Sequence, residues 1–219
     1  MKSRIADAAG RSGRPPENIQ LVAVTKTVGA VEARALHDLG VRDFGENRVQ
    51  EALRKMEALK DLDARWHMIG HVQSNKANKV VGAFHLVHSL DGIHLAQVMD
   101  ESAGRRGASV NALIEVNVSG EETKGGFSPD ELERAIEEIA GMKNLHVLGL
   151  MTMAPIADDP ENVRPFFARL RELRDAHATN IPANVELRHL SMGMTQDFEV
   201  AIEEGADIVR IGAALFREE

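Results

Sequence analysis

The chain has 219 residues, of which 26 are Lys or Arg and 34 are Asp or Glu, giving a formal net charge of −8 at pH 7. This balance argues against a nucleic-acid surface, because phosphate binding needs clustered Lys and Arg, and no apolar run approaches the roughly 20 residues needed to cross a membrane. Cysteine and tyrosine are absent; this excludes disulfides, zinc–thiolate sites and thiol nucleophiles, and without an export signal we expect a cytoplasmic protein.

Short β-like runs alternate with helical segments along the chain, the order expected of a parallel sheet covered by helices. A helix over about 1–14 comes first, followed by a largely apolar run, 19–25, that is typical of a strand buried on both faces. The expected strands are 19–25, 41–45, 66–70, 84–88, 112–118, 147–151, 185–189 and 207–211. The expected helices between them are 31–39, 47–59, 75–81, 93–106, one that opens at Ser128, 160–179 and 196–204, with a loop over 119–127.

Eight β/α units within this length predict an α/β fold of the (β/α)8 TIM barrel class, formed by a single domain over 1–219. A doubly wound open sheet ranks second because it usually needs fewer strands. We see no linker, low-complexity segment or internal repeat that would divide the chain.

Polar and glycine-rich segments follow the predicted strands at their C-terminal ends, which is where the active face of a TIM barrel is built. They are Lys26, 45–47, 70–73, 88–89, Asn117, 151–153, 190–193 and 210–212. Lys26 follows a buried strand, so we expect its ammonium to be partly desolvated, which favours a nucleophilic amine. A strand-end lysine reaching solvent is the plain alternative.

Ser191, Gly193 and Gly212 lie after the seventh and eighth predicted strands, where barrels of this class often bind phosphate. Each is a weak signal alone, because Gly and Ser also form ordinary turns. Together with a barrel lysine they indicate a phosphorylated carbonyl compound, of which pyridoxal 5′-phosphate (PLP) is the commonest.

The same segments resemble the PLP homeostasis protein family over nearly the whole chain and in the right order. The matching segments are LVAVTK (21–26), FGENRVQE (44–51), WHMIGHVQSNK (66–76), VNVSGEETKGGF (116–127), GLMTM (149–153), LSMGM (190–194) and VRIG (209–212). The resemblance implies a PLP fold type III barrel, like the N-terminal domain of alanine racemase but without the second domain of the racemase.

The resemblance also implies roles for individual residues. Lys26 matches the lysine that holds PLP as a Schiff base (internal aldimine), and Arg210 resembles the arginine that faces the pyridine nitrogen in the racemase. The residues expected at the phosphate or beside the cofactor are Ser191, Gly193, Gly212, Ala213, Asn47 and Met153. The chain departs from the family pattern at Thr25, where serine is frequent, at Val28, where a second lysine is frequent, and at Ala213, which lacks the usual hydroxyl.

These features favour a protein that binds, buffers and delivers PLP with little or no amino-acid turnover. Arginine at the ring nitrogen disfavours its protonation, and the chain has no tyrosine to serve as a second base. The alternative is a fold-type III PLP enzyme, such as a racemase, decarboxylase or aldolase. Expected partners are PLP and PLP-dependent apoenzymes that accept it, and we expect a monomer.

Two further features carry less weight. The nine histidines do not show the spacing of a metal site, so we expect none. The charged loop 120–126 reads as a solvated surface loop, and its Lys124 is a weaker candidate for contact with an incoming phosphate or carboxylate.

Overall fold

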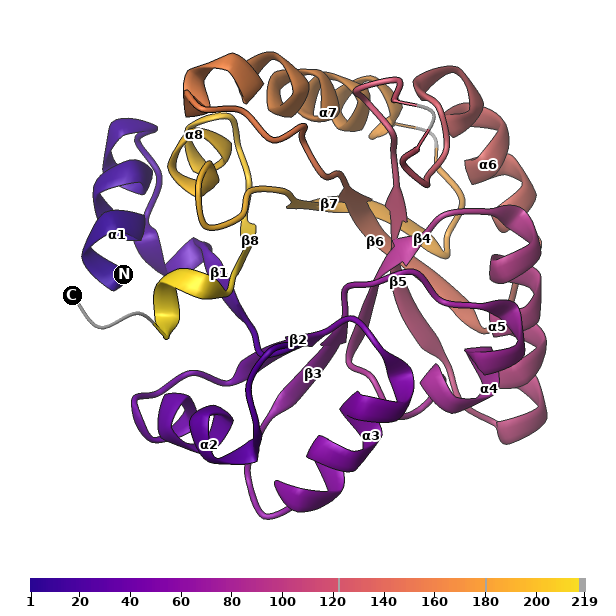
Figure 1. Cartoon of the computed structure of the whole chain (residues 1–219). Helices are drawn as coiled ribbons and strands as arrows, with labels where there is room; N and C mark the ends of the chain where they lie inside the picture. The colour runs from indigo at the N-terminus through magenta and orange to yellow at the C-terminus, as the bar shows by residue number, and fades with distance from the viewer. Residues whose placement is uncertain (122, 180, 217–219) are drawn as a thin grey trace.

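The computed structural model describes residues 1–121, 123–179 and 181–216, and the predicted domain limit at 219 lies outside this part. Eight parallel strands close into a barrel in the order β1 to β8, which confirms the TIM barrel (Figure 1). The strands are β1 (Gln20–Val24), β2 (Asp43–Glu46), β3 (Arg65–Met68), β4 (Leu86–Leu90), β5 (Val110–Glu115), β6 (Leu145–Met151), β7 (Val185–Ser191) and β8 (Ile208–Ile211).

Helices surround the barrel and cover the outer faces of the strands (Figure 1). They are α1 (Lys2–Arg11), α2 (Ala30–Asp38), α3 (Val49–Ala58), α4 (Ala77–Val80), α5 (Ile93–Arg106), α6 (Leu132–Ile139), α7 (Arg164–His177) and α8 (Phe198–Glu203). Short 3-10 turns are η1 (Pro16–Asn18), η2 (Ser74–Lys76), η3 (Pro129–Glu131), η4 (Pro160–Val163) and η5 (Ala213–Leu215). Among the described residues, no helix has the length and hydropathy needed to span a membrane.

The apolar core has two parts. The larger part lies between the strands and the surrounding helices and includes Phe44, Phe167 and Phe198, all fully buried. The smaller part fills the barrel itself; its buried members are Val22, Leu86, Leu113, Met151 and Ile208. Burial of such side chains supplies the main driving force for the fold.

Three predicted elements were wrong in position. The strand expected over 84–88 runs from Leu86 to Leu90, so His88 and Ser89 are buried within it and do not lie at its end. The strand expected over 112–118 ends at Glu115, since Val116 makes only an isolated bridge to Phe127. The helix expected over 75–81 is a 3-10 turn followed by the four residues of α4.

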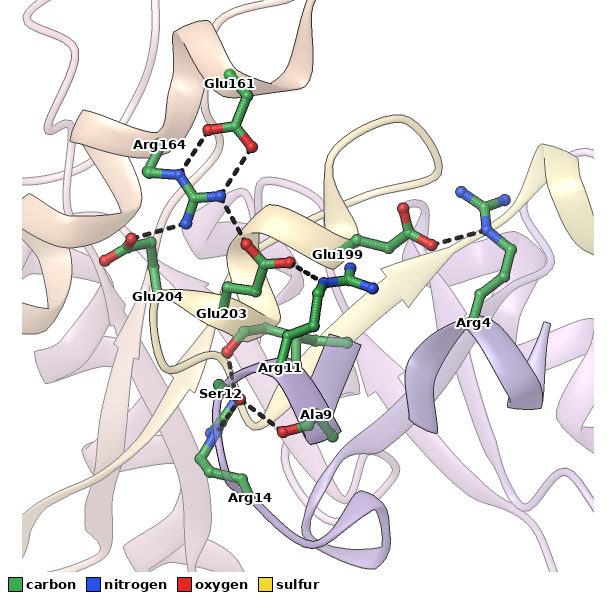
Figure 2. A network of polar contacts seen from close by, with 11 residues as sticks. Arg4, Ala9, Arg11, Ser12, Arg14, Glu161, Arg164, Glu199, Glu203 and Glu204 are labelled. Carbon is green, nitrogen blue, oxygen red and sulfur yellow. Dashed lines mark hydrogen bonds and ion pairs between the residues drawn. The ribbon is translucent and has the colours of Figure 1, made fainter. Parts of the chain in front are cut away.

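The helices α1 and α8 are joined by ion pairs on the outside of the barrel (Figure 2). Arg4 pairs with Glu199 at 3.0 Å and Arg11 pairs with Glu203 at 2.6 Å. The segment after α1 is also fixed, because Arg14 donates to the carbonyl oxygens of Ile202, Gly205 and Ala206 at 2.5, 3.2 and 2.7 Å. These contacts satisfy carbonyl groups at the C-terminal end of α8, directly before β8.

Candidate functional site

A cavity of about 790 Å³ opens at the C-terminal ends of the strands. Its walls include six of the residues that the sequence indicates, namely Lys26, Asn47, Met153, Arg210, Gly212 and Ala213. These residues come from the ends of four strands, β1, β2, β6 and β8, and barrel closure brings them to one opening. The arrangement agrees with the general location of ligand sites in this fold.

Lys26 lies in the turn that follows β1, two residues past the last strand residue. The expectation that its ammonium is partly desolvated was wrong, because the residue is exposed at the opening of the cavity. Its backbone is nevertheless fixed through the preceding residue. The buried hydroxyl of Thr25 donates to Glu46 Oε1 at 2.6 Å, and its carbonyl oxygen accepts from Lys55 Nζ at 2.7 Å.

The adjoining wall is formed by the segments after β7 and β8, since β8 pairs with β1 and β7 pairs with β8. Thr195, Gln196, Gly212 and Ala213 line it, and Gly212 N donates to Thr195 Oγ1 at 3.4 Å. Among the hydrogen bonds of the described residues, none uses the backbone N–H groups of Thr195, Gln196 or Ala213. A cavity wall with several donors of this kind suits an anionic group. Thr195 was missed in the sequence, although it lies two residues after the predicted Gly193.

Arg210 lies in the floor of the cavity, where it is 4% exposed. Its Nη1 donates to Ser191 Oγ at 2.5 Å and its Nη2 donates to the Thr152 carbonyl oxygen at 2.9 Å. Burial lowers the pKa of Arg210 to about 10, an effect that Glu115 and Asp197 oppose, so the guanidinium stays charged near pH 7. These two bonds fix the plane of the guanidinium and leave its other N–H groups available.

Ser191 and Gly193 do not line the cavity, which corrects the expectation that they contact a phosphate directly. Ser191 is fully buried, because its side chain points to the barrel axis, where it bonds Arg210 and His88. Gly193 has φ +91°, and a Cβ there would lie 2.5 Å from that of Ala201. A glycine is therefore required at position 193 for close packing of the loop on α8.

Asn47 and Met153 form side walls. The loop after β3 packs tightly on Asn47, since a Cβ on Gly70 would lie 2.5 Å from the Asn47 carbonyl oxygen. Met153 is 38% exposed, and its carbonyl oxygen accepts from Lys124 Nζ at 3.3 Å. Lys124 also pairs with Glu121 at 3.0 Å and does not line the cavity.

Acidic residues of the cavity were missed in the sequence. Glu115 lines the wall as the last residue of β5, and it was overlooked because the predicted strand ran three residues too far. Burial, together with Asp91, raises the pKa of Glu115 to about 7. Asp91 in turn bonds His71 Nδ1 at 2.5 Å. Among the described residues, no group of three or more His, Asp or Glu side chains is placed to hold a metal ion.

Comparisons with known proteins place the chain in a family. The model of the alanine racemase N-terminal domain matches residues 1–219. The chain is 50% identical to the pyridoxal phosphate homeostasis protein of Aquifex aeolicus, over 98% of this chain and 93% of that protein. It is 36% identical to the protein of the same name from Escherichia coli K12, over 99% of this chain and 92% of that protein.

Solved structures give the same result. PipY of Synechococcus elongatus with PLP bound is 35% identical, with a TM-score of 0.85 over 97% of this chain and 100% of that chain. Alanine racemase of Clostridium difficile is 15% identical and shares only the fold, with a TM-score of 0.73 over 99% of this chain and 55% of the racemase chain. The chain thus belongs to the pyridoxal phosphate homeostasis protein family, with the barrel of the alanine racemase N-terminal domain.

Proposed function

We propose that this chain binds PLP in the cavity through Lys26, and that it buffers and delivers the cofactor. The observation that carries the proposal is that one cavity combines an exposed lysine after β1 with backbone N–H donors on the adjoining segments after β7 and β8. A relative 35% identical to this chain has been solved with PLP bound, which supports the same ligand here.

The two walls suit the two ends of PLP. The Lys26 amine adds to the aldehyde carbon with loss of one water, which masks the reactive aldehyde. The N–H groups of Thr195, Gln196 and Ala213, which line the cavity and have no backbone acceptor among the described residues, would hold the phosphate oxygens. The Lys26 side chain is exposed, so a competing amine or water can reach the same bond, and this suits release of the cofactor.

Arg210 favours a carrier over an enzyme. PLP supplies an electron sink for amino-acid chemistry, most effectively when its ring nitrogen is protonated through an Asp or Glu partner. With a pKa of about 10, Arg210 stays protonated at neutral pH. Its free N–H groups would donate to the ring nitrogen of a bound PLP. It therefore disfavours protonation of that nitrogen and weakens the electron sink.

The alternative function is a fold-type III PLP enzyme, such as a racemase, decarboxylase or aldolase. Glu115 is the observation in its favour, because a cavity carboxyl with a pKa of about 7 can accept or donate a proton near neutral pH. We place this second because Arg210 works against the carbanion that all three reactions need.

The proposal includes a monomer in the cytoplasm that passes PLP to apoenzymes. Support for a monomer comes from the exposed large hydrophobic side chains of the described residues, which are Val31, Leu39, Met153 and Ile156. The last two line the cavity, so little apolar surface is left for a subunit interface. Light scattering during gel filtration checks the mass, which is 24.0 kDa for one chain.

The test is an absorbance titration with PLP of the wild type, Lys26→Ala and Lys79→Ala. Lys79 lies exposed on α4 away from the cavity and serves as the matched control. The wild type and the control should bind one PLP each and transfer it to an apoenzyme, while Lys26→Ala should lose the lysine-bound absorbance. Rapid turnover of alanine, threonine or another amino acid by the wild type would favour the enzyme instead.

A further inference from the structure

A continuous chain of hydrogen bonds crosses the interior of the barrel and ends at Arg210. Asp43 Oδ1 bonds His67 Nε2 at 3.0 Å, and His67 Nδ1 bonds His88 Nε2 at 2.9 Å. His88 Nδ1 bonds Ser191 Oγ at 2.8 Å, and Ser191 Oγ accepts from Arg210 at 2.5 Å. This series of hydrogen bonds links β2, β3, β4, β7 and β8. Both histidines and Ser191 have no exposed surface.

The far end of this chain reaches solvent. Asp43 pairs with Arg65 at 2.7 Å, and the Arg65 side chain is 51% exposed. Both residues line a second cavity of about 710 Å³, at the N-terminal ends of the strands. The hydrogen bonds therefore connect the two ends of the barrel, from this second cavity to the floor of the PLP site.

The proton positions follow from the partners. Burial opposes ionisation of Asp43, but hydrogen bonds from His67 and Arg65 hold its pKa well below its usual range, so it accepts from His67 Nε2–H. Because the Nε2–H of His67 is directed to Asp43, its Nδ1 is the atom that accepts from His88 Nε2–H. Burial, with His67 and Arg210 nearby, lowers the pKa of His88 well below its usual value, so its Nδ1 accepts from the Ser191 hydroxyl. Every donor in this series of hydrogen bonds thus points from Arg210 toward Asp43.

We propose that Asp43, His67, His88 and Ser191 are positioning residues that hold the Arg210 guanidinium in the cavity floor through this one-directional relay. The relay itself does not depend on the proposed function; only its expected effect on PLP rests on it. Ser191 Oγ is a fixed acceptor for Arg210 because the Ser191 hydroxyl donates to His88 Nδ1. His88 keeps the tautomer that accepts there because its Nε2–H donates to His67. Retention of PLP therefore depends on His67, which does not line the cavity.

Two variants of His67 test the transmission. His67→Asn keeps a side-chain oxygen that can accept from His88 Nε2–H. His67→Leu has no such acceptor, although an apolar side chain is compatible with the barrel interior. We expect PLP to leave His67→Leu about 5- to 10-fold faster than the wild type, and His67→Asn within about 2-fold of it. Equal release from both variants, at the wild-type rate, would overturn the proposal.

Nitrogen-15 NMR of the histidines tests the proton order without PLP and without substitution. Both rings should carry the proton on Nε2, with a scalar coupling between His88 Nε2 and His67 Nδ1 across the hydrogen bond. A His88 Nδ1–H tautomer or a charged ring would overturn the relay even if PLP binds. If the wild type does not bind PLP, the proposed function fails, and the NMR result still decides the relay.

Discussion

The hydroxyl of Thr25 donates to the buried carboxylate of Glu46 at 2.6 Å, one residue before the lysine that we expect to hold PLP. Lys55 completes the arrangement, since its ammonium contacts both Glu46 and the Thr25 carbonyl oxygen. The side chains of Lys55 and Glu46 are 10% and 1% exposed. The turn that bears Lys26 is thus tied to β2 and α3 by a buried ion pair.

Removal of Lys55 should destabilise the protein strongly. Lys55→Met leaves Glu46 as an unpaired buried charge, and breaking one partner of such a pair costs about 3–5 kcal/mol of unfolding free energy. Urea unfolding measures the loss. The double variant Lys55→Met/Glu46→Leu removes both charges and should recover most of it; a double variant no more stable than Lys55→Met would speak against this account of the pair.

Substitution of Arg210 should weaken PLP binding while the protein keeps its fold. Arg210→Lys keeps a cation but loses the planar pair of bonds to Ser191 and Thr152, and charge-assisted bonds of this kind are worth about 1.5–3 kcal/mol. We expect the dissociation constant for PLP to rise about 10- to 100-fold in an absorbance titration. Arg188→Lys, on an exposed position of β7, is the control and should bind like the wild type.

Glu115 should make stability fall with rising pH. Its pKa is raised from 4.5 to about 7, so the folded state binds more protons than the unfolded state between these values. Its contribution is complete below about pH 4.5 and is lost as the pH rises through about 7. Glu115→Gln should therefore be more stable than the wild type at pH 8, by about 3 kcal/mol, and similar at pH 4.

Chemical denaturation at both pH values measures this difference. Glu133→Gln, exposed on α6, is the matched control and should leave the pH dependence unchanged. If the free energies of unfolding of the wild type and Glu115→Gln differ by the same amount at pH 4 and at pH 8, Glu115 does not titrate as expected.

Arg14 should matter more for stability than the exposed ion pairs near it. It bonds three backbone carbonyl oxygens at the end of α8, and Arg14→Ala leaves them without these donors, at a cost of about 2–4 kcal/mol. Thermal unfolding should show the loss. In contrast, Arg134→Ala removes a pair with side chains 82% and 37% exposed, and such pairs contribute about 0–1 kcal/mol. Similar losses in both variants would contradict the role given to Arg14.

The sequence was sufficient for the architecture, because the alternation of strands and helices is strong and a parallel barrel constrains what each strand end can face. Lys26, Arg210 and Gly212 were found in this way, since each lies at or just past the end of a strand and lines the cavity. The prediction that Lys26 is partly buried was wrong, because the sequence pattern does not show how far a side chain in the turn after a strand reaches into solvent.

The polar interior was not predictable from spacing. His67 and His88 are 21 residues apart in the sequence, and the closed barrel brings His67 Nδ1 to 2.9 Å from His88 Nε2. A shift of two residues in β4 decided whether His88 lay at the rim or in the interior. Glu115 was missed for the same reason, because its predicted strand extended past it. Errors of two or three residues in a strand end therefore decide whether a side chain is assigned to the cavity or to the interior.

The central claim is that Lys26 carries PLP, and borohydride reduction tests it most directly. The wild type is incubated with PLP, reduced, digested and mapped by mass spectrometry, with Lys26→Ala treated in parallel. We expect one stable pyridoxyl adduct on the peptide that contains Lys26 and none on the variant. An adduct spread over other lysines, or equal labelling of the two proteins, would contradict the assignment of Lys26 and the cofactor site with it.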